Sequence, residues 1–222
     1  MQTIKDKGFE PVSLKQVGLA MSGKAALPRN AIAITIDDGL EDNYTNAFAI
    51  MSEFNIPATI FLTTGYMGGQ NSWMQGEGFP SRPMLNWTQV KEMARHGIAF
   101  GAHSVNHPRL STLQKTAAHA EIYDSKQEIE EQLGSACEHF AYPYGDFIEQ
   151  TTELVKEAGF TLGCSTRSGF NNNERSPFAL HRIEVYGTDP KWKLKQKITF
   201  GHNDASLFFP VKYYVDRLTD RS

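Results

Sequence analysis

The sequence predicts an α/β protein built on a parallel β-sheet. Short runs rich in β-branched residues alternate along the chain with longer segments whose apolar residues recur at helical spacing. Polar residues suited to catalysis follow directly after several of the short runs, where parallel strands end at one edge of a sheet. A length of 222 residues suits one domain, so we expect residues 1–222 to fold as a single domain.

The first β-α-β unit covers residues 31–63. Ala31–Ile36 is a compact apolar run that ends at a polar turn, which indicates a buried strand. Asn43–Phe54 carries apolar side chains at helical spacing and therefore predicts a helix. Pro57 then precedes a second predicted strand, Ala58–Thr63.

The same alternation continues toward the C-terminus. A helix is expected between Asn86, a suitable N-cap, and Gly97, followed by a strand at Ile98–Ala102. The remaining expected elements are helices at 113–133 and 148–158 and strands at 139–142, 160–165 and 179–185. Gly65–Pro83 is the one long stretch without a predicted element, and loops of that length often serve a function. The pattern alone permits either a doubly wound sheet or a barrel.

Composition excludes several classes of protein. The 22 basic and 25 acidic residues give a net charge of −3, so no nucleic-acid partner is expected. No apolar run is long enough to span a bilayer. The N-terminal residues lack the apolar stretch of a signal peptide, and cytoplasmic and exported locations both stay open. Cys137 and Cys164 are expected to pack in the core, with a single disulfide as the alternative. The oligomeric state is not predicted.

Two strand ends carry residues that could bind a metal. Asp37 and Asp38 follow the first strand, where a turn lets one carboxylate ligate a cation while the other stays free as a base. His103 and His107 follow the strand at 98–102, at a spacing that allows both imidazoles to bind one ion. One carboxylate and two histidines would leave coordination positions for water and substrate. The alternatives are an ordinary polar turn and a pair of structural histidines.

Three other segments could complete a site. The turn within Phe140–Asp146 can present the backbone N–H of Tyr144 to a developing oxyanion, while its rings and Pro143 shape a groove of sugar size. Trp73 lies in the long loop that could border this groove. Farther along, His181 or Arg182 could face the pocket from the last expected strand, although a lone histidine is more often structural.

In this order the motifs resemble the polysaccharide deacetylases with the NodB homology domain, carbohydrate esterase family 4. Thr35–Gly39 resembles the first family motif, T-F-D-D-G, and His103–Pro108 resembles the second, H-[ST]-x-x-H-P. The resemblance extends from about Phe9 to Val185. It implies a distorted (β/α)7 barrel, open at one side. Compared with longer relatives, this chain is expected to lack an N-terminal strand or a leader.

The resemblance implies a hydrolase that removes N-acetyl groups from a sugar or polysaccharide. Asp37 would be the general base. Asp38, His103 and His107 would bind a divalent metal, most often zinc, with cobalt or nickel as alternatives. The Tyr144 N–H would stabilise the oxyanion, and the expected partner is an N-acetylated glycan.

The chain departs from the commonest family pattern after the second motif. Ala141 stands where the third motif, F-R-P-P-Y-G, has an arginine that orients the base, and the Y-P-Y-G form resembles the branch that acts on bacterial exopolysaccharides. We expect Arg182 to replace that arginine. His181 is the expected general acid, with His202 or no residue as the alternatives.

Two other functions stay open at this stage. The same metal site could hydrolyse an amide that is not a sugar, or an O-acetyl ester. The chain could also be a glycan-binding relative without catalytic activity. Asp37 favours an enzyme, because a binding protein needs no free base beside its metal ligands.

Overall fold

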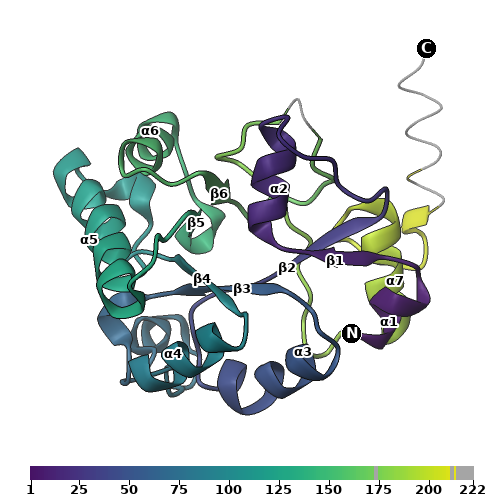
Figure 1. The fold of residues 1–222 in the computed structure, drawn as a ribbon, viewed down its shortest axis with the longest axis horizontal. Helices are drawn as coiled ribbons and strands as arrows, with labels where there is room; N and C mark the ends of the chain where they lie inside the picture. The colour runs from purple at the N-terminus through teal and green to yellow at the C-terminus, as the bar shows by residue number, and fades with distance from the viewer. Residues whose placement is uncertain (173–174, 211–212, 214–222) are drawn as a thin grey trace.

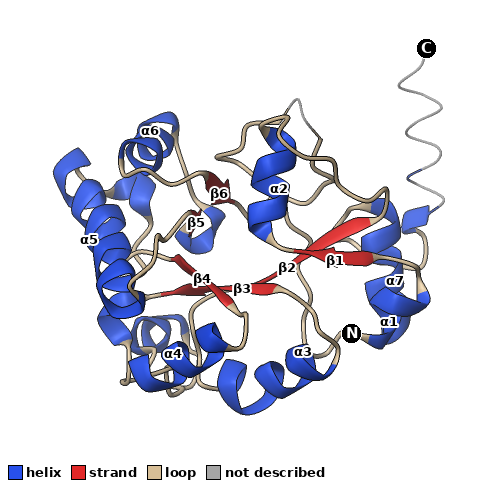
Figure 2. Cartoon of the chain, viewed as in Figure 1, coloured by secondary structure: helices blue, strands red, loops and turns tan. Residues whose placement is uncertain are grey.

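The computed structural model describes residues 1–172, 175–210 and 213. Its centre is one parallel sheet of six strands, which Figure 2 shows in red. The strands are β1 (Glu10–Val12), β2 (Ala31–Ile36), β3 (Ala58–Leu62), β4 (Ala99–Ala102), β5 (His139–Ala141) and β6 (Leu162–Cys164). Their order in the sheet is their order in the chain. The sheet curves into a half-barrel with helices around its outer side, which is a distorted α/β barrel as expected (Figure 1).

Seven α-helices connect or flank these strands in the described part of the chain. They are α1 (Gln2–Asp6), α2 (Leu14–Met21), α3 (Ala49–Glu53), α4 (Trp87–Arg95), α5 (Lys115–Leu133), α6 (Glu149–Glu157) and α7 (Lys191–Phe200). The other helical segments are the π-helix η1 (Asn43–Phe48) and the 3-10 helices η2 (Thr64–Tyr66), η3 (Ser72–Glu77), η4 (Leu110–Thr112) and η5 (Pro143–Gly145). No helix among these residues is apolar enough over sufficient length to cross a membrane.

Local sequence signals set the ends of the helices. Asn86 caps α4 in a reciprocal pair of hydrogen bonds, accepting from Gln89 N at 3.0 Å and donating its own N–H to Gln89 Oε1 at 2.9 Å. Gly134 ends α5 with a φ of 65°, in the left-handed region that glycine adopts without strain. The predicted boundaries of these two helices are therefore confirmed to within about two residues.

The larger of two buried apolar clusters lies between the sheet and the helices on its outer face. The central strand β3 is buried over its whole length, as expected for a parallel strand covered on both faces. Met93, Ile122 and Leu154 bring apolar side chains from α4, α5 and α6 into the same cluster. Cys137 and Cys164 are both buried and free, which confirms a packing role. Burial raises the pKa of the Cys137 thiol to about 12 and that of Cys164 to about 11.

Two sequence-based expectations about the fold are wrong. No strand forms at 179–185: only Leu180 makes a bridge to β6, and the next backbone donors turn to other segments, with Arg182 N bonding to Arg167 O at 2.9 Å. Val185, which made the run look like a strand, is 58% exposed. The stretch 65–83 is not without structure, since it contains part of η2 and all of η3 and pairs back at Gln70 and Pro83.

Candidate active site

The candidate site lies at the carboxyl ends of β2, β4 and β5. Asp37 and Asp38 follow β2, His103 follows β4, and η5 follows β5. The turn after β2 is sharp, with φ values of 75° at Asp38 and 81° at Gly39. A Cβ at Gly39 would meet the Leu62 side chain at 2.8 Å, so glycine lets this turn pack directly against β3.

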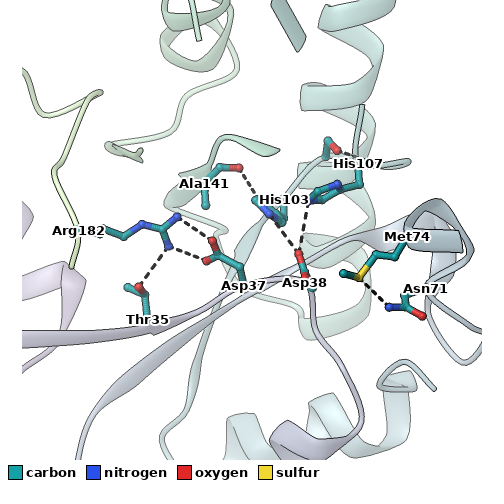
Figure 3. Close-up of polar contacts among 10 residues, drawn as sticks. Thr35, Asp37, Asp38, Asn71, Met74, His103, His107, Ala141 and Arg182 are labelled. Atoms are coloured by element: carbon teal, nitrogen blue, oxygen red, sulfur yellow. Dashed lines mark hydrogen bonds and ion pairs between the residues drawn. The ribbon is translucent and has the colours of Figure 1, made fainter. Parts of the chain in front are cut away.

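Three side chains from two strand ends form a site that could bind a cation. Asp38 Oδ1 lies 3.5 Å from His103 Nε2 and 3.4 Å from His107 Nε2 (Figure 3). The three possible ligand atoms all lie within 4.8 Å of one another. One carboxylate and two imidazoles are the donors of many catalytic zinc sites. The structure thus brings together the residues that the sequence suggested as metal ligands.

The pKa values of the two histidines are shifted in opposite directions. His103 Nδ1 donates to Ala141 O at 2.7 Å, which directs Nε2 toward Asp38. Burial would lower the pKa of His103, but Asp38 and Asp37 outweigh it and raise that pKa. The pKa of His107 is lowered, chiefly by burial. The pKa of Asp38 is lowered despite its burial, because both imidazoles hydrogen-bond to it. Protons compete with a cation for both imidazoles, so cation binding should weaken at acidic pH.

The second carboxylate, Asp37, is paired with Arg182 instead. Arg182 Nη1 and Nη2 donate to Asp37 Oδ1 and Oδ2 at 2.6 and 2.7 Å (Figure 3). The same guanidinium donates to Thr35 Oγ1 at 3.2 Å and to Ser165 O at 2.8 Å, which fixes its orientation. Burial would raise the pKa of Asp37, but Arg182 and His103 hold it below its ordinary value. Asp37 is therefore a carboxylate at neutral pH.

Aromatic rings enclose His107. The Trp73 ring stacks on it with centroids 5.0 Å apart, and the Tyr144 ring meets it edge-on at 4.6 Å. Tyr66 packs behind Trp73, with centroids 4.7 Å apart. Pro143 is buried at the start of η5, and Tyr144 has a φ of 58°. The predicted substrate-binding residues thus lie beside the predicted metal ligands.

The two candidates for a general acid have contacts elsewhere. His181 Nδ1 donates to Ser168 O at 3.0 Å, and its Nε2 accepts from Arg175 at 2.9 Å. His181 is thus held by Ser168 and Arg175, whereas its neighbour Arg182 reaches Asp37. His202 stacks on Phe209, and its Nδ1 accepts from a backbone N–H at 2.9 Å. The structure does not bring either histidine to the group around Asp37.

The family profile described as polysaccharide deacetylase matches residues 24–163. The chain belongs to the polysaccharide deacetylase family. Among curated members, YxkH of Bacillus subtilis is 28% identical over 185 residues, covering 83% of this chain and 62% of YxkH. The poly-beta-1,6-N-acetyl-D-glucosamine N-deacetylase of Staphylococcus aureus is 28% identical over 171 residues, covering 73% of this chain and 57% of that protein. The chain thus spans about three fifths of the length of these relatives.

Solved deacetylase structures share the fold. The Streptococcus pyogenes deacetylase PplD, in complex with acetate, superposes with a TM-score of 0.76 at 27% identity, covering 89% of this chain and 83% of PplD. IcaB from Ammonifex degensii has the same fold, with a TM-score of 0.75 at 23% identity and coverage of 84% and 81%. The family and the barrel that the motifs predicted are confirmed.

Proposed function

We propose that this deacetylase-family protein is a metal-dependent hydrolase that removes N-acetyl groups from an N-acetylated glycan. The observation that carries the proposal is that two adjacent carboxylates have different partners. Asp38 lies against two histidines, whereas Asp37 is held ionised by Arg182 and is not one of the three clustered ligands. A free carboxylate beside a cation site is what a water-activating hydrolase requires.

The residues at this site fit a divalent cation. Asp38, His103 and His107 would hold it, and their mixed oxygen and nitrogen donors suit zinc, with cobalt and nickel as alternatives. When bound, such an ion acts as a Lewis acid and lowers the pKa of water toward about 7.

Asp37 is suited to receive the proton of the attacking water. Its two oxygens accept from Arg182, but a carboxylate has about four lone-pair positions, so two stay available for a proton. Arg182 also keeps Asp37 from turning away from the substrate, because its guanidinium is anchored on Thr35 and Ser165. These contacts support our proposal that Arg182 takes the positioning role expected for it.

The other predicted residues would hold the substrate. The backbone N–H of Tyr144 would donate to the oxyanion formed from the acetamide carbonyl. The Trp73 and Tyr144 rings beside His107 would contact the apolar face of the sugar, and Pro143 would fix the turn that presents Tyr144. With His181 engaged elsewhere, we assign the protonation of the leaving amine to Asp37, which returns the proton it accepted.

Acetate release tests this proposal. The metal-stripped protein should release no acetate from N-acetylglucosamine oligomers, and added zinc or cobalt should restore release. Acetylated xylan and small amides, assayed in parallel, test the ester and non-sugar alternatives. Full activity in a demonstrably metal-free preparation would refute the metal site, and glycan binding with zinc present but no acetate released would favour a binding protein.

A further inference from the structure

We infer that Glu121, on α5, is a positioning residue for the metal ligands. Its carboxylate fastens the turn at residues 104–107, which ends in His107 and begins next to His103. The inference rests on the proposed metal site but assigns a role to a residue outside it. Glu121 is one of many acidic residues on a surface helix, and its spacing gives no sign of this role.

Glu121 accepts three hydrogen bonds from the turn. Its Oε2 accepts from the backbone N–H groups of Val105 and Asn106 at 3.0 and 2.8 Å. Its Oε1 accepts from Asn106 Nδ2 at 2.8 Å. Successive backbone N–H groups of a turn form a concave site for an anion, and here the anion is a side chain of the same protein. On the opposite side, Val105 O accepts from Gly65 N at 2.8 Å, so the turn is held from both α5 and η2.

The turn needs such support because its backbone is strained. Ser104 has a φ of 65° and His107 a φ of 58°, in the left-handed region that residues with a Cβ adopt only at a cost in free energy. Ser104 Oγ accepts from His107 N at 2.9 Å, which closes the turn internally. This internal bond cannot orient the turn relative to the rest of the site. The bonds from Glu121 do so, because α5 packs against β4.

His107 depends on the turn more than His103 does. The ring of His103 is anchored through Nδ1 on Ala141 O. His107 Nδ1 is buried without a hydrogen-bond partner among the described residues. Apart from the contact of its Nε2 with Asp38, the direction of the His107 ring is thus set by the backbone of the turn and by the rings of Trp73 and Tyr144. Loosening the turn should therefore weaken cation binding through His107.

The test is the affinity for zinc, measured on metal-stripped protein by competition with a chromophoric chelator and without substrate. Glu121→Gln removes the charge and one acceptor oxygen while keeping the shape of the side chain. We expect this substitution to lower the zinc affinity about 10- to 100-fold, which is the usual effect of losing a residue that orients metal ligands. Glu121→Ala should lower it further. Glu131→Gln is the matched control, since Glu131 is exposed on the same helix, and it should bind zinc as the parent protein does.

A second measurement separates positioning from general stability. In the metal-free protein, amide hydrogen exchange at Val105 and Asn106 should accelerate in Glu121→Gln more than exchange in β3 and β4 does. Asn106→Ala deletes only the bond to Oε1 and should lower zinc affinity severalfold, which keeps the test informative where a Glu121 variant does not fold. Zinc affinity within twofold of the parent in Glu121→Gln, or in Asn106→Ala together with unchanged exchange, would overturn the inference. Zinc binding that depends on Glu121, with no acetate released from any acetylated glycan, would refute the proposed function alone.

Discussion

Breaking the ion pair between Asp37 and Arg182 is the sharpest test of the site, because this contact joins residues far apart in the chain. Arg182→Met removes the guanidinium and keeps much of the side-chain volume. It leaves Asp37 without its cation and beside Asp38, so the pKa of Asp37 should rise. We expect lower stability and a slower reaction, with zinc content nearly unchanged because Arg182 does not contact the ligand cluster.

The size of the stability effect follows from the geometry. Removing one partner of a buried, hydrogen-bonded ion pair costs about 3–5 kcal/mol. The Asp37 side chain is 29% exposed and that of Arg182 is 15% exposed, so solvent screens the pair. We therefore expect a coupling free energy of about 2 kcal/mol between the two residues in a double-mutant cycle. For catalysis, loss of such an orienting partner should lower turnover about 10- to 100-fold.

Urea unfolding of the metal-free protein at pH 7 measures the coupling across the parent, Asp37→Asn, Arg182→Met and the double variant. Because the folded pKa of Asp37 is lowered, its contribution is complete above the ordinary carboxyl pKa of 3.8 and is lost as the pH falls through the folded value. Arg95→Met, an exposed arginine on α4, is the control. Zero coupling at pH 7, or an unchanged turnover in Arg182→Met, would show that Arg182 only packs.

Three further predictions concern single residues. Asp37→Asn should lower acetate release by about 10²- to 10⁴-fold while zinc content is kept, whereas His107→Ala should lose both acetate release and zinc. Substantial acetate release by Asp37→Asn would show that Asp37 is not the base. Trp73→Ala should raise KM for glycan oligomers about 3- to 10-fold with a smaller change in kcat, as loss of a stacking ring would, and an unchanged KM would place Trp73 outside the sugar site. Burial lowers the pKa of His139 to about 4, so the folded protein should lose about 3 kcal/mol of stability between pH 6.5 and pH 4, where only the unfolded chain binds the proton. Unfolding curves of His139→Phe over that range should lack this loss, and an equal loss in both proteins would contradict it.

The sequence was most informative where local chemistry and periodicity agree. Strand β2 is a continuous apolar run that stops at Asp37 and Asp38, so both the strand and the site residues could be found together. The spacing of His103 and His107 predicted a shared ion, and the structure places their Nε2 atoms beside one carboxylate. Arg182 was predictable because Ala141 stands where the family resemblance implies an arginine, and the structure pairs Arg182 with Asp37.

Other features depended on contacts that no local pattern shows. Strand β1 is three residues long and contains a proline, so its sequence does not resemble a strand. In α7 a lysine stands at every second position from Lys191 to Lys197, so the sequence does not show that Lys197 and Ile198 are buried. Both elements were missed. The choice between His181 and Arg182 needed the direction of each side chain, which depends on how the chain turns after Leu180 bridges to β6. Glu121 could not be distinguished from other acidic residues of α5, because its role depends on the turn it faces.

The sequential order of the strands has a consequence for how the protein matures during synthesis. The three proposed cation ligands precede Arg182 in the chain, and so do Glu121 and Ala141, which hold the ligand turn and the His103 ring, whereas Arg182 comes only after β6. The proposed cation site and the residues that hold it are thus synthesised before the guanidinium that pairs with Asp37. A product cut between Cys164 and Arg182 would retain the three proposed ligands and lose the guanidinium that pairs with Asp37.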